Sequence, residues 1–172
     1  MAVKTTGDAL SLFLQVQKAY LKYCYNAVKD EPIKMTEMMC ILYLDENAPN
    51  DTSNEIAKRY MLSRSLVSKT VDGLKSAGYL QTERDQTDNR KIHLHLTEKC
   101  APILGKINRA KDAFYNGMSR DVTDRDREAL CDFAQKLKRN LNTLVGHRSP
   151  RTLAALHSAP DADAYFDWTM KG

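Results

Sequence analysis

The stretch Ser63-Arg-Ser-Leu-Val-Ser-Lys-Thr-Val-Asp-Gly-Leu-Lys-Ser-Ala-Gly78 decides the fold that we predict for this chain. A serine before a helix can cap it, because its hydroxyl oxygen accepts a hydrogen bond from a free backbone N–H group of the first turn. Glycine ends many helices, because it takes the left-handed conformation of the C′ residue without steric cost. Ser63 and Gly78 therefore bracket a predicted helix over residues 64–77.

This predicted helix has an apolar face and a polar face. The residues expected to face a core are Leu66, Val67, Val71 and Leu74. The residues expected on the exposed face are Arg64, Ser65, Ser68, Lys69 and Asp72. An α-helix fits the major groove of DNA, and side chains near its N-terminus reach the base edges. The polar face is typical of a recognition helix, in which Arg64 would bind guanine and Lys69 and Lys75 would contact phosphates.

A second, shorter helix is predicted just before it. Thr52 with Glu55 three residues later fits a capping box and predicts a helix over residues 53–60. The break Tyr60-Met-Leu-Ser63 then separates the two helices, which together form a helix-turn-helix candidate. Turns of this kind often contain glycine, whereas Met61 stands in this one.

A β-hairpin is predicted directly after the recognition helix. Residues 79–84 precede a polar stretch over 85–91, and Ile92-His-Leu-His-Leu96 then alternates strictly between apolar and polar residues. A hairpin in this place is a wing. From Lys58 to Lys91 the chain has eight Lys and Arg against four Asp and Glu, an excess of +4 that equals the net charge of the whole chain. The basic charge that DNA phosphates attract is therefore concentrated in this segment.

The helices on both sides of this segment predict a homodimer. Residues 8–29 form an amphipathic stripe, and a helix capped by Thr36 and running to Glu46 is apolar all round, so it is expected to be buried. Thr97 is expected to start a further helix, and Thr123 to cap the last one. The last helix carries an apolar strip at close to heptad spacing, made of Leu130, Phe133, Ala134, Leu137, Leu141 and Leu144. A winged helix does not need these helices to cover its core, so residues 8–29 and 97–147 are predicted to form a dimer interface.

The predicted fold class is mainly α with a small β-hairpin wing: a winged helix-turn-helix whose N- and C-terminal helices form a dimerisation domain. Residues 1–35 and 97–147 make up the dimerisation region, and residues 36–96 the DNA-binding domain. Residues 148–172 form a tail of unknown role with an acidic, aromatic end that holds the one tryptophan.

Several other classes of protein are not indicated by the sequence. It has no P-loop, no G-x-S-x-G, no H-E-x-x-H and no dinucleotide-binding glycine pattern, so neither an enzyme nor a cofactor is predicted. It also lacks the apolar segment of a signal peptide and any run long enough to span a membrane, so a cytoplasmic location is expected. The four cysteines have no C-x-x-C spacing and are expected to be free thiols. His93 and His95 share a strand face but have no third ligand nearby, so no metal site is predicted.

Four short segments together resemble the MarR family of bacterial regulators. They are Leu62-Ser-Arg-Ser-Leu-Val-Ser-Lys69, Leu74-Lys-Ser-Ala-Gly-Tyr-Leu80, Asp88-Asn-Arg90 and Leu94-His-Leu-Thr-Glu-Lys99, preceded by Asn54-Glu-Ile-Ala57. The resemblance covers about residues 8–147. It implies a triangular dimer of winged-helix lobes, with each recognition helix in a major groove and Arg90 in the adjacent minor groove, held by an ion pair with Asp88. It also implies a repressor that releases DNA on binding an aromatic or phenolic ligand or on thiol oxidation.

The chain departs from the family pattern in three places. The wing commonly contains Asp-Arg-Arg, whereas Asn89 takes the middle position here. A proline early in the wing is replaced near Gln86, and the glycine that often follows Leu-Thr-Glu-Lys is Cys100. The first departure removes one phosphate contact, and none removes the main DNA contacts.

Two sets of site residues follow from these predictions. The DNA-binding set is Ser63, Arg64, Ser65, Ser68, Lys69, Lys75, Arg84, Asp88, Arg90 and Lys91. The candidate ligand pocket between the dimer helices and the DNA-binding lobe is Tyr20, Tyr23, Cys24, Met39 and Tyr43, although residues of these types at helical spacing are more often plain core. The predicted partners are double-stranded DNA, a second copy of the chain and a small aromatic ligand, with no membrane. The alternatives are a winged-helix protein-interaction module and a thiol-oxidation sensor, for which Cys100 near a helix N-terminus is the best thiolate candidate.

Overall fold

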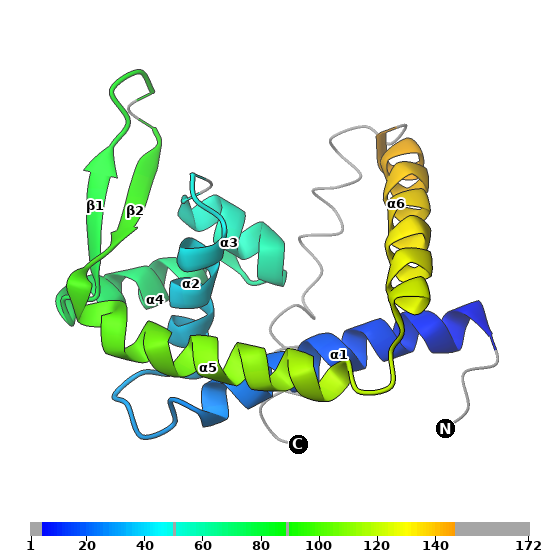
Figure 1. The fold of residues 1–172 in the computed structure, drawn as a ribbon. Coiled ribbons are helices and arrows are strands. Elements are labelled where there is room, and N and C mark those ends of the chain that lie inside the picture. The colour runs from blue at the N-terminus through cyan, green and yellow to red at the C-terminus, as the bar shows by residue number, and fades with distance from the viewer. Residues whose placement is uncertain (1–4, 50, 89, 147–172) are drawn as a thin grey trace.

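A computed structural model describes residues 5–49, 51–88 and 90–146, so the predicted tail at 148–172 lies outside the described residues. The described chain is mainly helical with one two-stranded hairpin, which confirms the predicted fold class (Figure 1). The elements in chain order are α1 (Thr6–Asn26), α2 (Met35–Glu46), α3 (Ser53–Tyr60), α4 (Arg64–Ser76), β1 (Leu80–Arg84), β2 (Ile92–Leu96), the 3₁₀ turn η1 (Glu98–Cys100), α5 (Ala101–Met118) and α6 (Asp124–Gly146).

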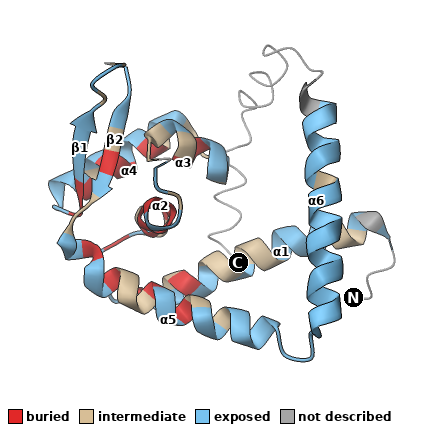
Figure 2. Cartoon of the chain, turned by 45° about the horizontal axis from the view of Figure 1, so that its top comes forward, coloured by how far each residue is buried: buried red, intermediate tan, exposed pale blue. Residues whose placement is uncertain are grey.

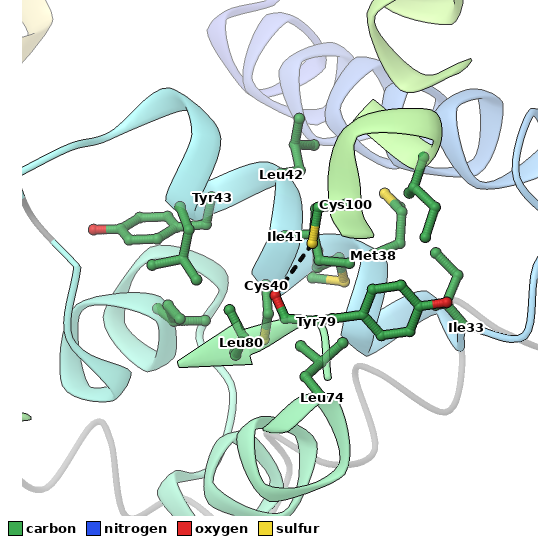
Figure 3. Packing of buried hydrophobic residues seen from close by; sticks show 14 of the residues in the cluster. Ile33, Met38, Cys40, Ile41, Leu42, Tyr43, Leu74, Tyr79, Leu80 and Cys100 are labelled. Carbon is green, nitrogen blue, oxygen red and sulfur yellow. Dashed lines mark hydrogen bonds between the residues drawn. The ribbon is translucent and has the colours of Figure 1, made fainter. Parts of the chain in front are cut away.

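Helix α2 forms the centre of the core, with α3, α4 and the hairpin packed around it. Every residue from Met38 to Leu44 is buried, as the apolar run predicts. Figure 3 shows side chains of α2 packed against Leu74 of α4, Leu80 of β1 and Cys100 of η1. A helix that is apolar on every side is stable only when other elements cover all of it. The same core also contains Cys24 and Val28 from the α1 end and Ile103 and Ile107 of α5, so α1 and α5 help to cover α2.

The two helices of the helix-turn-helix begin where the sequence predicts. The Glu55 carboxylate accepts a hydrogen bond from the Thr52 N–H at 3.0 Å, and the Ser63 hydroxyl accepts one from the Leu66 N–H at 3.2 Å. Between the helices Met61 takes the left-handed conformation, with φ 54°. Glycine takes this conformation without steric cost, which is why it is common in such turns. Met61 has the same backbone geometry although it carries a side chain.

The hairpin is antiparallel, with Leu80 opposite Leu96 and Arg84 opposite Ile92. Gly78 precedes β1 with φ 75°, as expected for the residue that ends α4. The strict alternation over residues 92–96 predicts that Ile92, Leu94 and Leu96 share an apolar face. Leu94 is buried, but Ile92 is 47% exposed because the outer end of the hairpin extends beyond the helices (Figure 1).

Two predicted helix starts, at Thr36 and at Thr97, differ in the structure. Thr36 lies inside α2, because the Glu37 carboxylate accepts a hydrogen bond from the Lys34 N–H at 2.7 Å and so caps the helix at residue 34. The predicted helix at 97 begins with the η1 turn, and α5 starts at Ala101. The last helix agrees with the prediction, since the Thr123 hydroxyl accepts a hydrogen bond from the Asp126 N–H at 3.2 Å.

Helices α1 and α5 run antiparallel beneath the winged helix, and α6 stands away from them (Figure 1). Two ion pairs hold α5 in place: Lys106 contacts Glu31 at 2.6 Å, and Lys111 contacts Glu46 at the end of α2. Nearly all of α6 is exposed in Figure 2, including its apolar residues. No helix within the described ranges combines the length and the apolar character that crossing a membrane requires.

Candidate nucleic-acid interface

Helix α4 has a buried face and an exposed face, as predicted, except that Leu66 is only half-buried. Val67, Val71 and Leu74 are buried, and Thr70 joins them through a hydrogen bond from its hydroxyl to the Leu66 carbonyl at 2.9 Å. The opposite face is exposed along the helix and carries Arg64, Ser65, Ser68, Lys69, Asp72 and Lys75. Because one face of α4 is packed in the core, its polar face points toward solvent.

The start of α4 presents groups that suit a DNA contact. Ser63 uses its hydroxyl oxygen for the Leu66 N–H, while Arg64 and Ser65 extend into solvent. Free N–H groups and the helix dipole favour a phosphate at such an end. The forked Arg64 guanidinium has two parallel donors for the O6 and N7 edge of guanine.

The wing carries a second group of exposed cations, made of Arg84, Arg90 and Lys91. Its turn is organised by Asp85, whose Oδ1 accepts hydrogen bonds from the Thr87 hydroxyl at 2.6 Å, the Thr87 N–H at 2.7 Å and the Asp88 N–H at 2.8 Å. These donors stabilise the carboxylate, and the Thr87 hydroxyl contributes most to holding the pKa of Asp85 well below its ordinary value. The wing turn is therefore built on an ionised carboxylate.

Asp88 holds the wing by the backbone. Its Oδ1 accepts a hydrogen bond from the Arg90 N–H at 3.1 Å. The ion pairs of the described residues do not include one between Asp88 and the Arg90 guanidinium, which the family resemblance implied. Asp88 thus shapes the turn that carries Arg90, and the guanidinium remains exposed for a phosphate or a minor groove.

One contact that no sequence pattern indicates joins the wing to the rest of the winged helix. His93 of β2 lies between Asp51, which precedes α3, and Asp85 of the wing turn. The hydrogen bond with Asp51, followed by that with Asp85, raises the pKa of His93. The sequence indicates only that His93 and His95 share a strand face; among the described residues, no group of three or more His, Cys, Asp or Glu side chains is arranged to hold a metal ion.

The predicted ligand-pocket residues lie in two different environments. Cys24, Met39 and Tyr43 are buried in the core. Tyr20 and Tyr23 instead pack on Phe114 of α5, with ring centroids 5.5 and 5.6 Å apart. A cavity of about 510 Å³ lies between α1 and α5, and its lining residues are Tyr23, Asn26, Ala27, Lys106, Arg109 and Ala110. Tyr23 is the one residue of the five that lines this cavity. A ligand pocket formed by all five residues therefore remains a prediction.

Cys100 does not have the surroundings of a reactive thiolate. It is fully buried, and its thiol donates a hydrogen bond to the Tyr79 carbonyl at 3.3 Å (Figure 3). Burial raises the pKa of Cys100 above its ordinary value, so the thiol form is favoured. The sequence-based choice of Cys100 as a thiolate is therefore wrong, because proximity to a helix N-terminus does not compensate for removal from water. Cys24 and Cys40 are buried as well, and Cys131 is exposed.

Comparisons with known proteins agree with this geometry. A model of the MarR family matches residues 32–91. The HTH-type transcriptional regulator BilQ of Clostridioides difficile is 23% identical over 126 residues, which are 72% of this chain and 83% of that protein.

Two solved structures share the fold. A MarR-family transcriptional regulator from Silicibacter pomeroyi has a TM-score of 0.64 at 18% identity, over 77% of this chain and 88% of that one. CouR from Rhodococcus jostii RHA1, solved with p-coumaroyl-CoA, has a TM-score of 0.60 at 18% identity, over 78% of this chain and 95% of that one. The matched family and the curated relative are transcriptional regulators rather than enzymes, as the sequence predicts. Residues 32–91, which include the buried α2 and the polar face of α4, therefore match the MarR family of DNA-binding transcriptional regulators, and the chain as a whole is similar in fold to its solved members.

Proposed function

We propose that this protein is a sequence-specific repressor that binds DNA as a homodimer and releases it on binding a small aromatic acid. The observation that carries the DNA-binding part is the exposed polar face of α4 beside the basic wing. Arg64 would read guanine in the major groove, and Arg90 would enter the adjacent minor groove. Lys69 and Lys75 would contact phosphates and set the position of the helix.

Unpaired apolar surface supports the homodimer. Large apolar side chains are exposed on the first half of α1, at the end of α5 and along α6: Leu12, Phe13, Leu14, Tyr115, Met118, Leu130, Phe133, Leu141 and Leu144. Figures 1 and 2 place α6 and the start of α1 at the same end of the molecule, away from the winged helix. An apolar surface that continues over several helices is typical of a protein–protein interface. A second copy of the chain would bury it.

The cavity between α1 and α5 supports an anionic ligand. Lys106 and Arg109 line it together with the Tyr23 ring, so it offers cations and an aromatic face. Lys106 already pairs with Glu31 at 2.6 Å, and a competing carboxylate would change that contact between α5 and the α1–α2 connection. CouR was solved with p-coumaroyl-CoA, a thioester with an aromatic acyl group, which supports the aromatic part of the proposed ligand. The ligand is thus proposed to act on the helices that carry the winged helix.

The DNA-binding proposal is tested by fluorescence anisotropy with a duplex from upstream of the protein's own gene and a scrambled duplex. We expect tight binding to the first alone, and an affinity that falls as salt rises because phosphate contacts release counterions. Binding to neither duplex at low salt would contradict the proposal and favour the protein-interaction alternative. Equal binding to both would contradict sequence specificity at this site.

The ligand proposal is tested on the same complex. We expect p-coumarate to release the upstream duplex from the wild type, and Arg109→Ala to require a higher concentration of it. Lys29→Ala, an exposed change outside the cavity, serves as the matched control. Equal release from wild type and Arg109→Ala would place the ligand elsewhere.

A further inference from the structure

His93 joins two parts of the winged helix that are far apart in the sequence. Its Nδ1 is 2.6 Å from Asp51 Oδ1, and its Nε2 is 3.1 Å from Asp85 Oδ2. Asp51 lies between α2 and α3, whereas Asp85 starts the wing turn. The backbone strengthens this junction, since the Leu94 N–H donates to the Asp51 carbonyl at 3.0 Å. The imidazole therefore connects the wing to the segment that leads into the helix-turn-helix.

Both contacts of His93 are hydrogen bonds only when the ring is protonated. An ionised carboxylate can only accept, and a neutral imidazole has one N–H donor and one lone pair. The imidazolium has a donor on each side and fits Asp51 and Asp85 together. In the neutral ring, a nitrogen lone pair would face one of the two carboxylates, and that contact would be lost.

The neighbouring charges also favour the cation. The described titratable groups that face His93 are Asp51 before α3, Asp85 of the wing turn, His95 on its own strand and Glu83 on β1. Glu83 is the register partner of His93, and its carboxylate is 3.5 Å from His95 Nε2. The His95 ring stacks on His93 with centroids 6.4 Å apart. Three carboxylates against one further imidazole make this a predominantly acidic environment, which stabilises a positive charge on His93.

The carboxylate that binds His93 also shapes the turn of the wing. Asp85 Oδ2 contacts His93, while Oδ1 accepts the Thr87 and Asp88 hydrogen bonds. The Asp85 N–H donates to the Lys91 carbonyl at 3.1 Å, so the same residue closes the turn beside the wing cations. His93 and the turn that carries Arg90 are therefore both in contact with Asp85.

We propose that His93 is a positioning residue which, when protonated, clamps the wing to the segment before α3 and so makes DNA binding tighter at mildly acidic than at mildly alkaline pH. The inference rests on the DNA-binding function proposed above. The clamp is complete below the pKa of an unfolded histidine and is lost as the pH rises through the higher pKa of the folded protein. Because the contact is partly exposed, the expected loss of affinity is about two- to fivefold.

The first test measures binding of the upstream duplex at constant ionic strength between about pH 5.5 and pH 8.5. We expect wild type to lose affinity as the pH rises, and His93→Gln to bind at every pH like wild type at high pH. His95→Gln is the matched control, since His95 lies on the same strand and face and carries the same charge when protonated. It should keep the wild-type pH dependence. An unchanged pH dependence in His93→Gln, or an equal loss in both variants, would overturn the clamp.

The second test needs no DNA, so it separates failure of the clamp from failure of the DNA-binding function. The ring proton of His93 and the backbone amide signals of Thr87 and Asp88 are followed by NMR against pH. We expect His93 to titrate above the ordinary range of a histidine, the two amide signals to shift with the same midpoint, and Asp51→Asn to lower that midpoint. Amide signals that ignore the titration of His93, or a midpoint that Asp51→Asn leaves unchanged, would refute the proposal.

Discussion

The apolar residues of the winged helix and those of helix α6 differ in burial. In α2 every residue from Met38 to Leu44 is buried by the rest of the chain. In α6 the side chains of Leu130, Phe133, Leu141 and Leu144 are between 40% and 68% exposed. Both helices carry several apolar residues, yet among the described residues only those of α2 are covered by other elements. The difference teaches that amphipathic periodicity identifies a helix that packs, and does not tell whether its partner lies in the same molecule.

The largest effect is expected for the buried helix α2. Ile41→Ala in α2 removes a fully buried side chain and should lower the free energy of unfolding by about 2–5 kcal/mol, because it leaves a cavity in a packed core. Chemical denaturation followed by circular dichroism measures the loss. Leu144→Ala on exposed α6 is the control, and it should have a much smaller effect on an isolated monomer at high dilution. Equal losses would mean that α6 is packed as tightly as α2.

The variant Leu141→Asp tests the role of the exposed apolar residues of α6. The side chain is 56% exposed, so the change should leave the winged helix folded while a charge disrupts the apolar surface proposed for the dimer. We expect mainly monomer in sedimentation equilibrium and a loss of DNA affinity of at least about tenfold, since each copy would bind one half-site alone. Asn142→Asp adds the same charge one residue away and should remain a dimer. A dimeric Leu141→Asp variant would disprove this interface.

A third test divides the DNA contacts of the winged helix. Arg64→Ala should cost about 1–3 kcal/mol of binding to the upstream duplex and reduce the preference over scrambled DNA, because a base contact is lost. Arg90→Ala should weaken binding to both duplexes with a smaller change in preference. Anisotropy titrations of both variants measure these effects. Unchanged affinity in Arg90→Ala would exclude a role for the wing arginine.

The smallest expected effect concerns the cap of the recognition helix. Ser63→Ala removes the acceptor for the Leu66 N–H and should lower the free energy of unfolding by about 1 kcal/mol. Thermal unfolding of the variant beside wild type measures this change, and Ser68→Ala on the exposed face of the same helix is the control. A melting temperature equal to that of wild type would show that the cap contributes no stability.

Local signals predicted most of the fold. Ser63, Gly78 and the Thr52–Glu55 box act within a few residues of their own position, so the boundaries of α3 and α4 follow from chemistry that the sequence displays. The separation of α4 into a buried and an exposed face follows from helical periodicity in the same way. The prediction failed where two local signals competed, as at the start of α2, because Glu37 caps the helix at residue 34 and leaves Thr36 inside it.

Contacts between residues that are far apart in the sequence could not be predicted from it. Asp51 and His93 are 42 positions apart, and no spacing rule connects a residue in a turn with one in a wing. The inference about Cys100 failed for the same reason, since its position near a helix start indicated a thiolate while burial by Tyr79 and the core favours the thiol. The ligand pocket could not be separated from the core either, because tyrosine and methionine at helical spacing suit both.

The sequence by itself determined which segments are helices, where the wing lies and which face of α4 is polar, because caps, glycines and periodicity act over one or two turns. Only the tertiary structure decided which side chains meet across the chain. It buried Cys100, placed His93 between two carboxylates and left the apolar strip of α6 exposed. Burial and electrostatic environment depend on everything that surrounds a residue, and that is known only when all the elements have been packed together.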